Sequence, residues 1–312
     1  MIKGNLFNPH NDPQRTWSAG YQFRSSYDGR YRIIITSNAY WGLYYYDGTE
    51  NSLIQSGPSS HINTAAGGYN RLEVIMQSER GYLFINDQFV NALDLSRKVA
   101  AGNTWIIGAI FTDEMATGDL YSVNNFTIRA VQTDASSTGA NGTIENPNTG
   151  NIHTGSFIHL DYLAQGTLWA GDYLVEVNFD NSLASANGSL WDYGISEAPT
   201  DLNLPGRKQI HIIVNDTGTW FHKTVTSSSN QSETLDSGQS SAINTGSGES
   251  NKLTLLMRGT KGFLYINDVF ISELNVSSRT NSNYTWLQAA HWANSNLSGT
   301  EFTNHYAHYW SE

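Results

Sequence analysis

An aromatic run near the start of the chain, Trp41-Gly42-Leu43-Tyr44-Tyr45-Tyr46, has the side chains that a sugar-binding surface needs. Sugar rings lay their C–H faces on aromatic rings, while their hydroxyl groups bond to amide and carboxylate side chains. In a β-strand, successive side chains point to opposite faces, so Tyr44 and Tyr46 share the face opposite Trp41. Tyr44 and Tyr46 are therefore candidate ligand-binding residues.

A second aromatic run, Trp220-Phe221-His222-Lys223, places Trp220 and His222 on one face of an expected strand. His222 and the later pair His291-Trp292 are further candidate ligand-binding residues. Large aromatics that recur at matching places in both halves of a chain are more often core residues than ligand platforms. We therefore assign to packing the four tryptophans that recur in this way, namely Trp17, Trp105, Trp191 and Trp286.

Two carboxylates of the run Glu176-Val177-Asn178-Phe179-Asp180 share one face of an expected strand, because residues i, i+2 and i+4 point the same way. A pair of carboxylates can hydrolyse a glycosidic bond when one serves as the acid and the other as the base or nucleophile. Glu176 and Asp180 are thus the best of the weak catalytic candidates. The polar outer face of a half-buried strand explains the same alternation more simply, and we favour that interpretation.

The composition excludes several classes of protein. With 28 acidic and 17 basic residues, the formal net charge of -11 repels phosphate backbones, so we expect no nucleic-acid partner. No cysteine is present, which excludes disulfides, thiolate metal sites and a cysteine nucleophile. Apolar runs are far shorter than the roughly 20 residues that span a bilayer, so no transmembrane segment is expected. Serine-hydrolase, phosphate-loop and zinc-protease motifs are also missing from the sequence.

One pattern occurs twice in the chain, which indicates a duplication. The strand-like run 70–76 recurs as 251–257, and the run Gly81-Tyr82-Leu83-Phe84-Ile85-Asn86-Asp87 recurs, 181 positions later, as Gly262-Phe263-Leu264-Tyr265-Ile266-Asn267-Asp268. Asn and Asp tolerate the positive φ of a two-residue hairpin turn, so Asn86-Asp87 and Asn267-Asp268 are expected hairpin tips. Ser56-Gly57 recurs as Ser237-Gly238, and Trp17-Ser18-Ala19-Gly20 as Trp191-Asp192-Tyr193-Gly194.

The repeat divides the chain into a first β-domain over 1–132, a linker over 133–152 and a second β-domain over 153–312. The strand-like run 157–163 of the second domain has no counterpart in the first. An unpaired sheet edge is a liability, so we expect the missing strand to lie outside this sequence. The alternative is that a strand from the linker or from another chain fills the edge, a strand-sharing self-association in the second case.

The order of the motifs in each copy resembles that of the concanavalin A-like lectin/glucanase domains, of LamG-like type, of bacterial extracellular proteins. The motifs are, in order, the Trp-X-X-Gly segment, the long apolar strand, Ser-Gly, Asn-Arg/Lys-Leu, the aromatic Asn-Asp hairpin and the final Trp strand. The resemblance implies an all-β fold, with two tandem jelly-roll β-sandwiches. Retaining glucanases of this group carry a Glu-X-Asp-X-X-Glu strand motif, which this sequence lacks. Lectins of the group often hold Ca²⁺, for which Asp113, Glu114 and Asp119 are candidate ligands here.

The counterparts of those three residues are Asn294, Ser295 and Thr300, which do not preserve the charge, so no cofactor is firmly implied. His305 and His308 lie three apart on an expected strand, which directs them to opposite faces, and we expect isolated solvent-facing histidines. The hypothesis that follows is a non-catalytic, extracellular or cell-surface module that binds a glycan or polysaccharide. The export signal would lie outside this sequence. A glycoside hydrolase and a structural or assembly repeat are the two alternatives.

Overall fold

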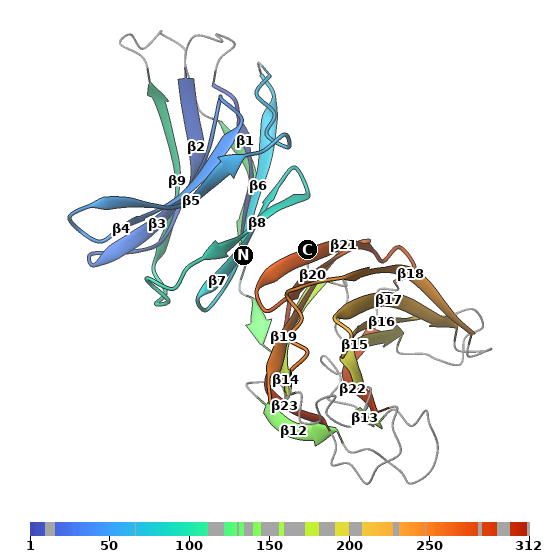
Figure 1. Cartoon of the computed structure of the whole chain (residues 1–312). Coiled ribbons are helices and arrows are strands. Elements are labelled where there is room, and N and C mark those ends of the chain that lie inside the picture. Colours follow the sequence, from blue (N-terminus) through green and yellow to red (C-terminus); the bar gives the residue numbers. More distant parts are fainter. Residues whose placement is uncertain are drawn as a thin grey trace. The chain divides into compact units, whose positions relative to one another are not determined.

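The computed structural model describes residues 1–9, 16–65, 67–111, 122–129, 131–133, 140–144, 156–158, 172–180, 191–199, 208–226, 231–246, 248–279, 283–291 and 300–310. The chain forms two compact units, Met1–Val131 and Gln132–Glu312 (Figure 1). Within the described ranges every paired strand is antiparallel to its neighbour and there is no helix, so no helix there is long and apolar enough to cross a membrane.

The first unit consists of two five-stranded sheets. The order of strands in one sheet is β10 (Val123–Ile128), β1 (Ile2–Phe7), β6 (Tyr69–Gln77), β7 (Arg80–Ile85) and β8 (Gln88–Asp94). The order in the other is β5 (Asn51–Pro58), β4 (Tyr40–Tyr46), β3 (Gly29–Thr36), β2 (Thr16–Ser26) and β9 (Asn103–Phe111).

The second unit repeats this arrangement and adds short strands. One sheet runs β11 (Gln132–Thr133), β23 (Thr300–Trp310), β14 (Asp172–Asp180), β19 (Ser250–Arg258), β20 (Lys261–Ile266) and β21 (Val269–Asn275), and β12 (Ala140–Ile144) also pairs with β23. The other runs β13 (Ser156–Ile158), β22 (Asn283–His291), β15 (Trp191–Pro199), β16 (Lys208–Asn215), β17 (Thr219–Thr226) and β18 (Gln231–Gln239). Two strands, β11 and β12, thus include residues of the segment expected to be a linker.

Alternation along the strands fills a separate core in each unit. In β3, for example, Tyr31, Ile33 and Ile35 are fully buried while the residues between them are partly exposed. The inward faces of both sheets contribute to one apolar cluster per unit. The all-β prediction, with two tandem jelly-roll β-sandwiches, is confirmed.

Glycines of the repeated motifs lie where two backbones or a backbone and an indole meet. A Cβ atom at Gly20 would lie 1.9 Å from the carbonyl oxygen of Ile33, and one at Gly194 the same distance from that of Ile212. At Gly238 a Cβ would lie 2.9 Å from the indole nitrogen of Trp220. These contacts explain why both Trp-X-X-Gly segments end in glycine and why glycine follows serine at 238.

The predicted hairpin tips are confirmed. Asn86 and Asp87 have φ values of 51° and 64°, and Asn267 and Asp268 have 47° and 71°, as a type I′ turn requires. Each first Asn also binds a fully buried Asn: Asn267 Nδ2 donates to Asn251 Oδ1 at 2.9 Å, and Asn86 Nδ2 to Asn70 Oδ1 at 3.2 Å. The repeated asparagines are therefore structural.

The two units differ at one sheet edge. In the second unit β13 pairs with the outer side of β22, opposite Leu287, whose side chain is 0% exposed. In the first unit β9 pairs with β2, and no described residue pairs with its other side. Ile106, which occupies the position of Leu287, is 41% exposed. Among the described residues no first-unit strand corresponds to β13, and a strand outside this sequence stays a prediction.

Candidate functional site

A row of five side chains crosses the β5-β4-β3-β2-β9 sheet of the first unit, with one residue from each strand. The strand register places them opposite one another in the order Leu53, Tyr44, Arg32, Gln22 and Trp105. We call these five residues the aromatic row. Since neighbouring strands lie about 4.8 Å apart, the backbones of Tyr44 and Trp105 are about 14 Å apart across the sheet.

The aromatic row lies on the face of the sheet that points away from the core. Tyr31 and Ile33, which flank Arg32, are both fully buried, so alternation turns Arg32 outward. Trp105 is 55% exposed and Leu53 is 53% exposed. The assignment of Trp105 to core packing was wrong: the tryptophan recurs in the sequence, but in this unit its strand presents it to the outside, opposite Gln22.

Two further aromatic contacts shape this face beside the row. The ring of Tyr44 lies over Gly42, where a Cβ atom would come within 2.8 Å of the Tyr44 ring. Tyr46 is two residues further along β4 on the same face, and the Arg30 guanidinium lies 4.1 Å from the centre of its ring. The structure therefore brings Tyr44 and Tyr46, both predicted from sequence, to one partly exposed face.

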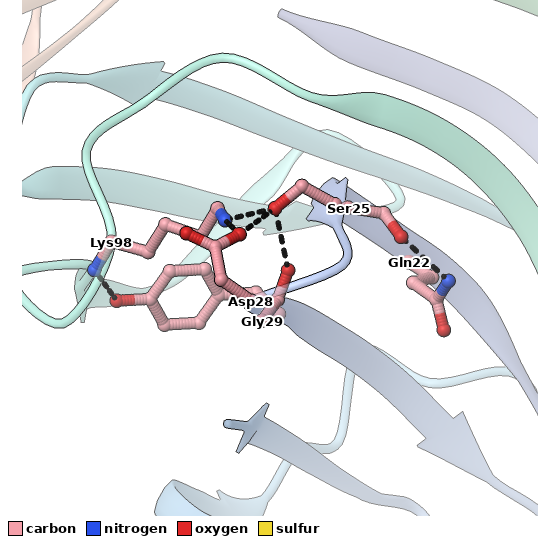
Figure 2. Close-up of polar contacts among 7 residues, drawn as sticks. Gln22, Ser25, Asp28, Gly29 and Lys98 are labelled. Atoms are coloured by element: carbon pink, nitrogen blue, oxygen red, sulfur yellow. Dashed lines mark hydrogen bonds and ion pairs between the residues drawn. The ribbon is translucent and has the colours of Figure 1, made fainter. Parts of the chain in front are cut away.

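Arg32 and Gln22 are held in place from the side of β2. Arg32 Nε donates to Gln22 Oε1 at 3.1 Å. Gln22 Nε2 in turn donates to Ser25 Oγ at 3.1 Å (Figure 2). A β-bulge follows Gln22, where the register of β2 shifts against both neighbouring strands. Arg24 in the bulge has a φ of 49° and donates to the carbonyl oxygen of Lys98 at 2.7 Å. Bulges of this kind re-aim the side chains beside them.

Lys98 fixes the β2–β3 turn at the end of the same face. Its ammonium group contacts the Asp28 carboxylate at 2.5 Å and also donates to the Ser26 hydroxyl, while its backbone N–H donates to the Tyr31 hydroxyl (Figure 2). Hydrogen bonds from Lys98 and then from Ser26 lower the pKa of the exposed Asp28 carboxyl to about 2. This charge is therefore already neutralised by Lys98.

The equivalent row of the second unit has other chemistry. The register aligns Thr234, Lys223, His211, Ser196 and Trp286 across β18, β17, β16, β15 and β22. His211 is buried, with Nδ1 2.9 Å from Ser196 Oγ and Nε2 3.2 Å from Gln209 Oε1. Lys223 Nζ lies 4.6 Å from the centre of the Phe221 ring. His211 and Lys223 thus replace the outward arginine and tyrosine of the first unit.

His222, a predicted ligand-binding residue, points into the core of the second unit. It is 1% exposed on the face of Trp220, and its Nε2 atom has no hydrogen-bond partner among the described residues. Burial lowers the pKa of His222, an effect that the Asp236 charge partly offsets. Alternation correctly grouped His222 with Trp220, but that shared face is the buried one, so His222 cannot contact a ligand on the outer face.

Replacing His222 with leucine should stabilise the second unit, since Leu43 occupies the matching position of the first unit. A buried polar atom without a partner costs about 1–3 kcal/mol, so we expect a gain of about 1 kcal/mol in the free energy of unfolding. Because the pKa of His222 is lower in the folded state, the unfolded state binds more protons in acid. His222 therefore destabilises the folded wild-type protein increasingly as the pH falls below about 6.5. Urea unfolding of H222L at pH 7.5 and 5.5 should show a larger gain at 5.5. An equal or smaller gain there would contradict the assignment.

The two catalytic candidates lie in the other sheet of the second unit. Glu176 is buried, its Oε1 is 3.0 Å from Lys252 Nζ, and it accepts a hydrogen bond from Thr254 Oγ1 at 3.3 Å. Asp180 is four residues along β14, so their backbones are about 13 Å apart. Burial and then the Glu301 charge raise the pKa of Asp180. The burial of Glu176 and its ion pair with Lys252 favour a structural role for this residue.

The expectation of solvent-facing histidines was wrong for His305 and His308, which are both buried. A β-bulge lies in β23 between Thr303 and Tyr306, with Asn304 at a φ of 52°, and it shifts the register of this strand against β14. His305 packs edge-on against Phe302, whereas His308 stacks on Tyr306 with ring centres 5.9 Å apart. The described residues contain no group of three or more His, Asp or Glu that could hold a metal ion.

Several sequence candidates are not among the described side chains. Trp292, Asp113, Glu114 and Asp119 are outside the described residues, and His291 is described only as the last residue of β22. Arg32, Gln22 and Leu53 were not predicted as site residues, because their significance comes from cross-strand register. The signal that was available is the alternation of Arg30 and Arg32 with apolar residues in β3.

No protein-family model and no curated protein match this chain. Among solved structures, it is similar to domains LG4-5 of the mouse laminin α1 chain, with 9% identity over 97% of this chain and 85% of that chain and a TM-score of 0.30. It is also similar to the carbohydrate-binding module CBM66 of Bacillus subtilis, with 12% identity, 54% and 92% coverage and a TM-score of 0.34.

Sheep galectin-11 in complex with glycerol is a third similar structure, with 14% identity over 50% of this chain and 99% of that chain and a TM-score of 0.28. These structures have concanavalin A-like folds. Two antiparallel sheets enclose one apolar core in each unit, with the motif residues at the hairpins and close backbone contacts described above. On that architecture, both units of the chain are jelly-roll β-sandwiches, as the sequence predicts.

Proposed function

We propose that the first unit binds a glycan on the outer face of its β5-β4-β3-β2-β9 sheet, as a non-catalytic module of an extracellular or cell-surface protein. The observation that carries this proposal is the aromatic row, in which a 55% exposed tryptophan and a partly exposed tyrosine flank an arginine and an amide. Aromatic rings bind the C–H faces of sugars, and Arg32 and Gln22 lie between the rings, where they can bond to hydroxyl groups.

The aromatic row is held rigidly by the sheet, which favours the binding of a weak ligand. Each of its residues comes from a different hydrogen-bonded strand, and the side chains of Arg32 and Gln22 are linked by a hydrogen bond. A rigid platform lowers the entropic cost of ordering side chains on binding, and aromatic side chains have few rotatable bonds to fix. The length of the row suits a short stretch of an extended oligosaccharide.

A glycan array followed by calorimetry tests this function. We expect at least one oligosaccharide to bind, and Trp105→Ala and Tyr44→Ala each to weaken its binding about tenfold or more. Tyr69→Ala is a matched control, because Tyr69 is a 45% exposed aromatic residue of the other sheet. Reducing-end release should remain at background with every bound glycan. Equal losses in all three variants, or a bound glycan that is cleaved, would contradict the proposal.

A second candidate function is strand-sharing self-association at the outer side of β9. Ile106 is 41% exposed, whereas Leu287, at the same position of the second unit, is fully buried opposite Ile158 of β13. Because β13 pairs with β22, and β22 matches β9 in the repeat, a β13-like strand of a second copy is the occupant that we propose.

Light scattering over a concentration series tests this association. The wild-type protein should form a dimer at high concentration, and Ile106→Lys should remain a monomer, since a charge at a sheet edge opposes strand addition. Val99→Lys is the control, because Val99 is also 45% exposed but precedes the strand. A wild-type protein that stays monomeric throughout would exclude this candidate.

A further inference from the structure

We propose that the ligand of the aromatic row is an acidic glycan, one whose sugar rings carry carboxylate groups, and that Arg32 binds the carboxylate. This inference rests on the proposed function of the same face and names its ligand class. It is based on the positive charges of this face, which are opposite in sign to the net charge of the whole chain.

Two arginines of the face, Arg30 and Arg32, have no acidic partner among the described residues. Among the residues that the structure describes, neither Arg30 nor Arg32 forms an ion pair, although the chain has 28 acidic residues and a net charge of -11. Several other cations of the protein are paired with carboxylates, including Lys98 with Asp28 at 2.5 Å, Lys252 with Glu176 at 3.0 Å and Lys261 with Glu273 at 2.7 Å.

The geometry of Arg32 leaves its charge available to a ligand. Its Nε–H donates a hydrogen bond to Gln22 Oε1 at 3.1 Å, and this bond fixes the plane of the guanidinium. The terminal N–H groups are the part that recognises a planar carboxylate with two parallel hydrogen bonds. Tyr44 is the neighbour of Arg32 on β4 and Trp105 is two strands away, so a carboxylate at Arg32 would belong to a sugar that also contacts the rings.

Arg30 supplies a second positive charge beside the first. It is two residues from Arg32 on the same face of β3, about 7 Å along the strand. Its guanidinium lies 4.1 Å from the centre of the Tyr46 ring, and no described residue forms a hydrogen bond with its Nε atom. Two neighbouring cations suit a polymer that carries a carboxylate on successive rings.

Two of the acidic side chains near this face in sequence are already engaged. Asp28 contacts Lys98, and Asp47 accepts hydrogen bonds from the backbone N–H groups of Thr49 and Glu50 at 2.9 and 2.8 Å. Both lie in the turns at one end of the face. The Debye length is about 8 Å at physiological ionic strength, so more distant carboxylates of this acidic protein repel a bound anion only weakly.

The second unit provides an internal contrast. At the position of Arg32 it has His211, whose ring nitrogens face Ser196 and Gln209, and at the position of Arg30 it has Gln209. The arginine pair is therefore specific to the first unit. Any acidic-glycan binding should depend on the first unit alone.

Calorimetry with matched acidic and neutral sugars tests the inference on the full chain. The probes are oligogalacturonate and oligoalginate, each beside its carboxyl-reduced form, together with dextran sulfate. We expect an acidic oligosaccharide to bind about tenfold or more tightly than its reduced form, and Arg32→Gln to remove that preference. Arg32→Lys should keep part of it, and rising NaCl concentration should weaken binding of the acidic form only.

The possible failures are distinguishable. If reduced and acidic forms bind equally and Arg32→Gln changes neither, the acidic class is wrong while glycan binding stands. If dextran sulfate binds more tightly than either uronate and still depends on Arg32, a carboxylate is the wrong anion. If no sugar binds and the wider glycan array is also negative, the proposed function fails and this inference fails with it. His211→Gln serves as the control, and it should leave the acidic preference unchanged.

Discussion

Replacing Asn251 with alanine is expected to lower the free energy of unfolding of the second unit by about 3 kcal/mol. Asn251 is fully buried and bonds through both ends of its amide. Its Oδ1 accepts from the Asn244 backbone at 2.7 Å and from Asn267 at 2.9 Å, and its Nδ2 donates to the Asn244 carbonyl at 2.8 Å and to the Tyr193 hydroxyl at 2.5 Å. Alanine leaves these buried partners unsatisfied and separates the turn at 240–244 from the β20–β21 hairpin.

Hydrogen exchange measured segment by segment separates this effect from a general loss of stability. In N251A the amides of β19, β20 and β21 should exchange faster, while β6 and β7 of the first unit should keep their protection. Asn70→Ala is the matched variant, with the opposite pattern, because Asn70 makes the equivalent bonds to Asn63 and Asn86. A loss below about 0.5 kcal/mol in both variants would show that the network is not structural.

The features that sequence predicts best are those set by a few neighbouring residues. Asn-Asp between two apolar alternations specifies a type I′ turn, because both residues must adopt positive φ, and both hairpins have that geometry. The repeat also predicts equivalent strands, since residues that pack alike must recur at equal spacing. Gly20 is different: its role depends on a carbonyl of Ile33, which only the pairing of β2 with β3 brings near.

The choice of which face is buried was harder to predict. Alternation shows which side chains share a face, but β9 carries apolar residues on both, so Trp105 could not be assigned from pattern alone. His222 shows the opposite error. It was predicted to face a ligand, yet it shares the buried face of its strand with Trp220. A bulge such as that in β23 changes the alternation by one residue and leaves no mark in the sequence.

The candidate site was predictable only in part for the same reason. Tyr44 and Tyr46 were identified because they lie on one face of a single strand and differ from the second copy. The other members of the aromatic row come from four other strands, and their alignment depends on the bulges in β2 and β5. Register across a sheet is a property of several pairings together, so a site that crosses the strands emerges only from the fold.

Replacing Arg279 with methionine is expected to have the largest effect on stability, a loss of about 3–5 kcal/mol in the second unit. Arg279 Nε lies 2.9 Å from Glu197 Oε1, and the two side chains are 4% and 3% exposed. The Tyr173 hydroxyl donates to Glu197 Oε2 at 2.5 Å. Burial and then the Glu197 charge raise the pKa of Tyr173, so its hydroxyl keeps its proton. Methionine fills a similar volume but leaves the Glu197 carboxylate buried without a cation.

The first unit shows how the pair could be removed without that penalty. Phe23 occupies the position of Glu197 there and stacks on Tyr31, with ring centres 5.6 Å apart. The double variant E197F/R279M should therefore recover most of the stability lost in R279M, because no buried charge remains. Urea unfolding of the wild type, both single variants and the double variant gives the coupling energy. A double variant whose loss equals the sum of the single losses would show that Glu197 and Arg279 act independently, and that burial of an unpaired carboxylate is not the cause.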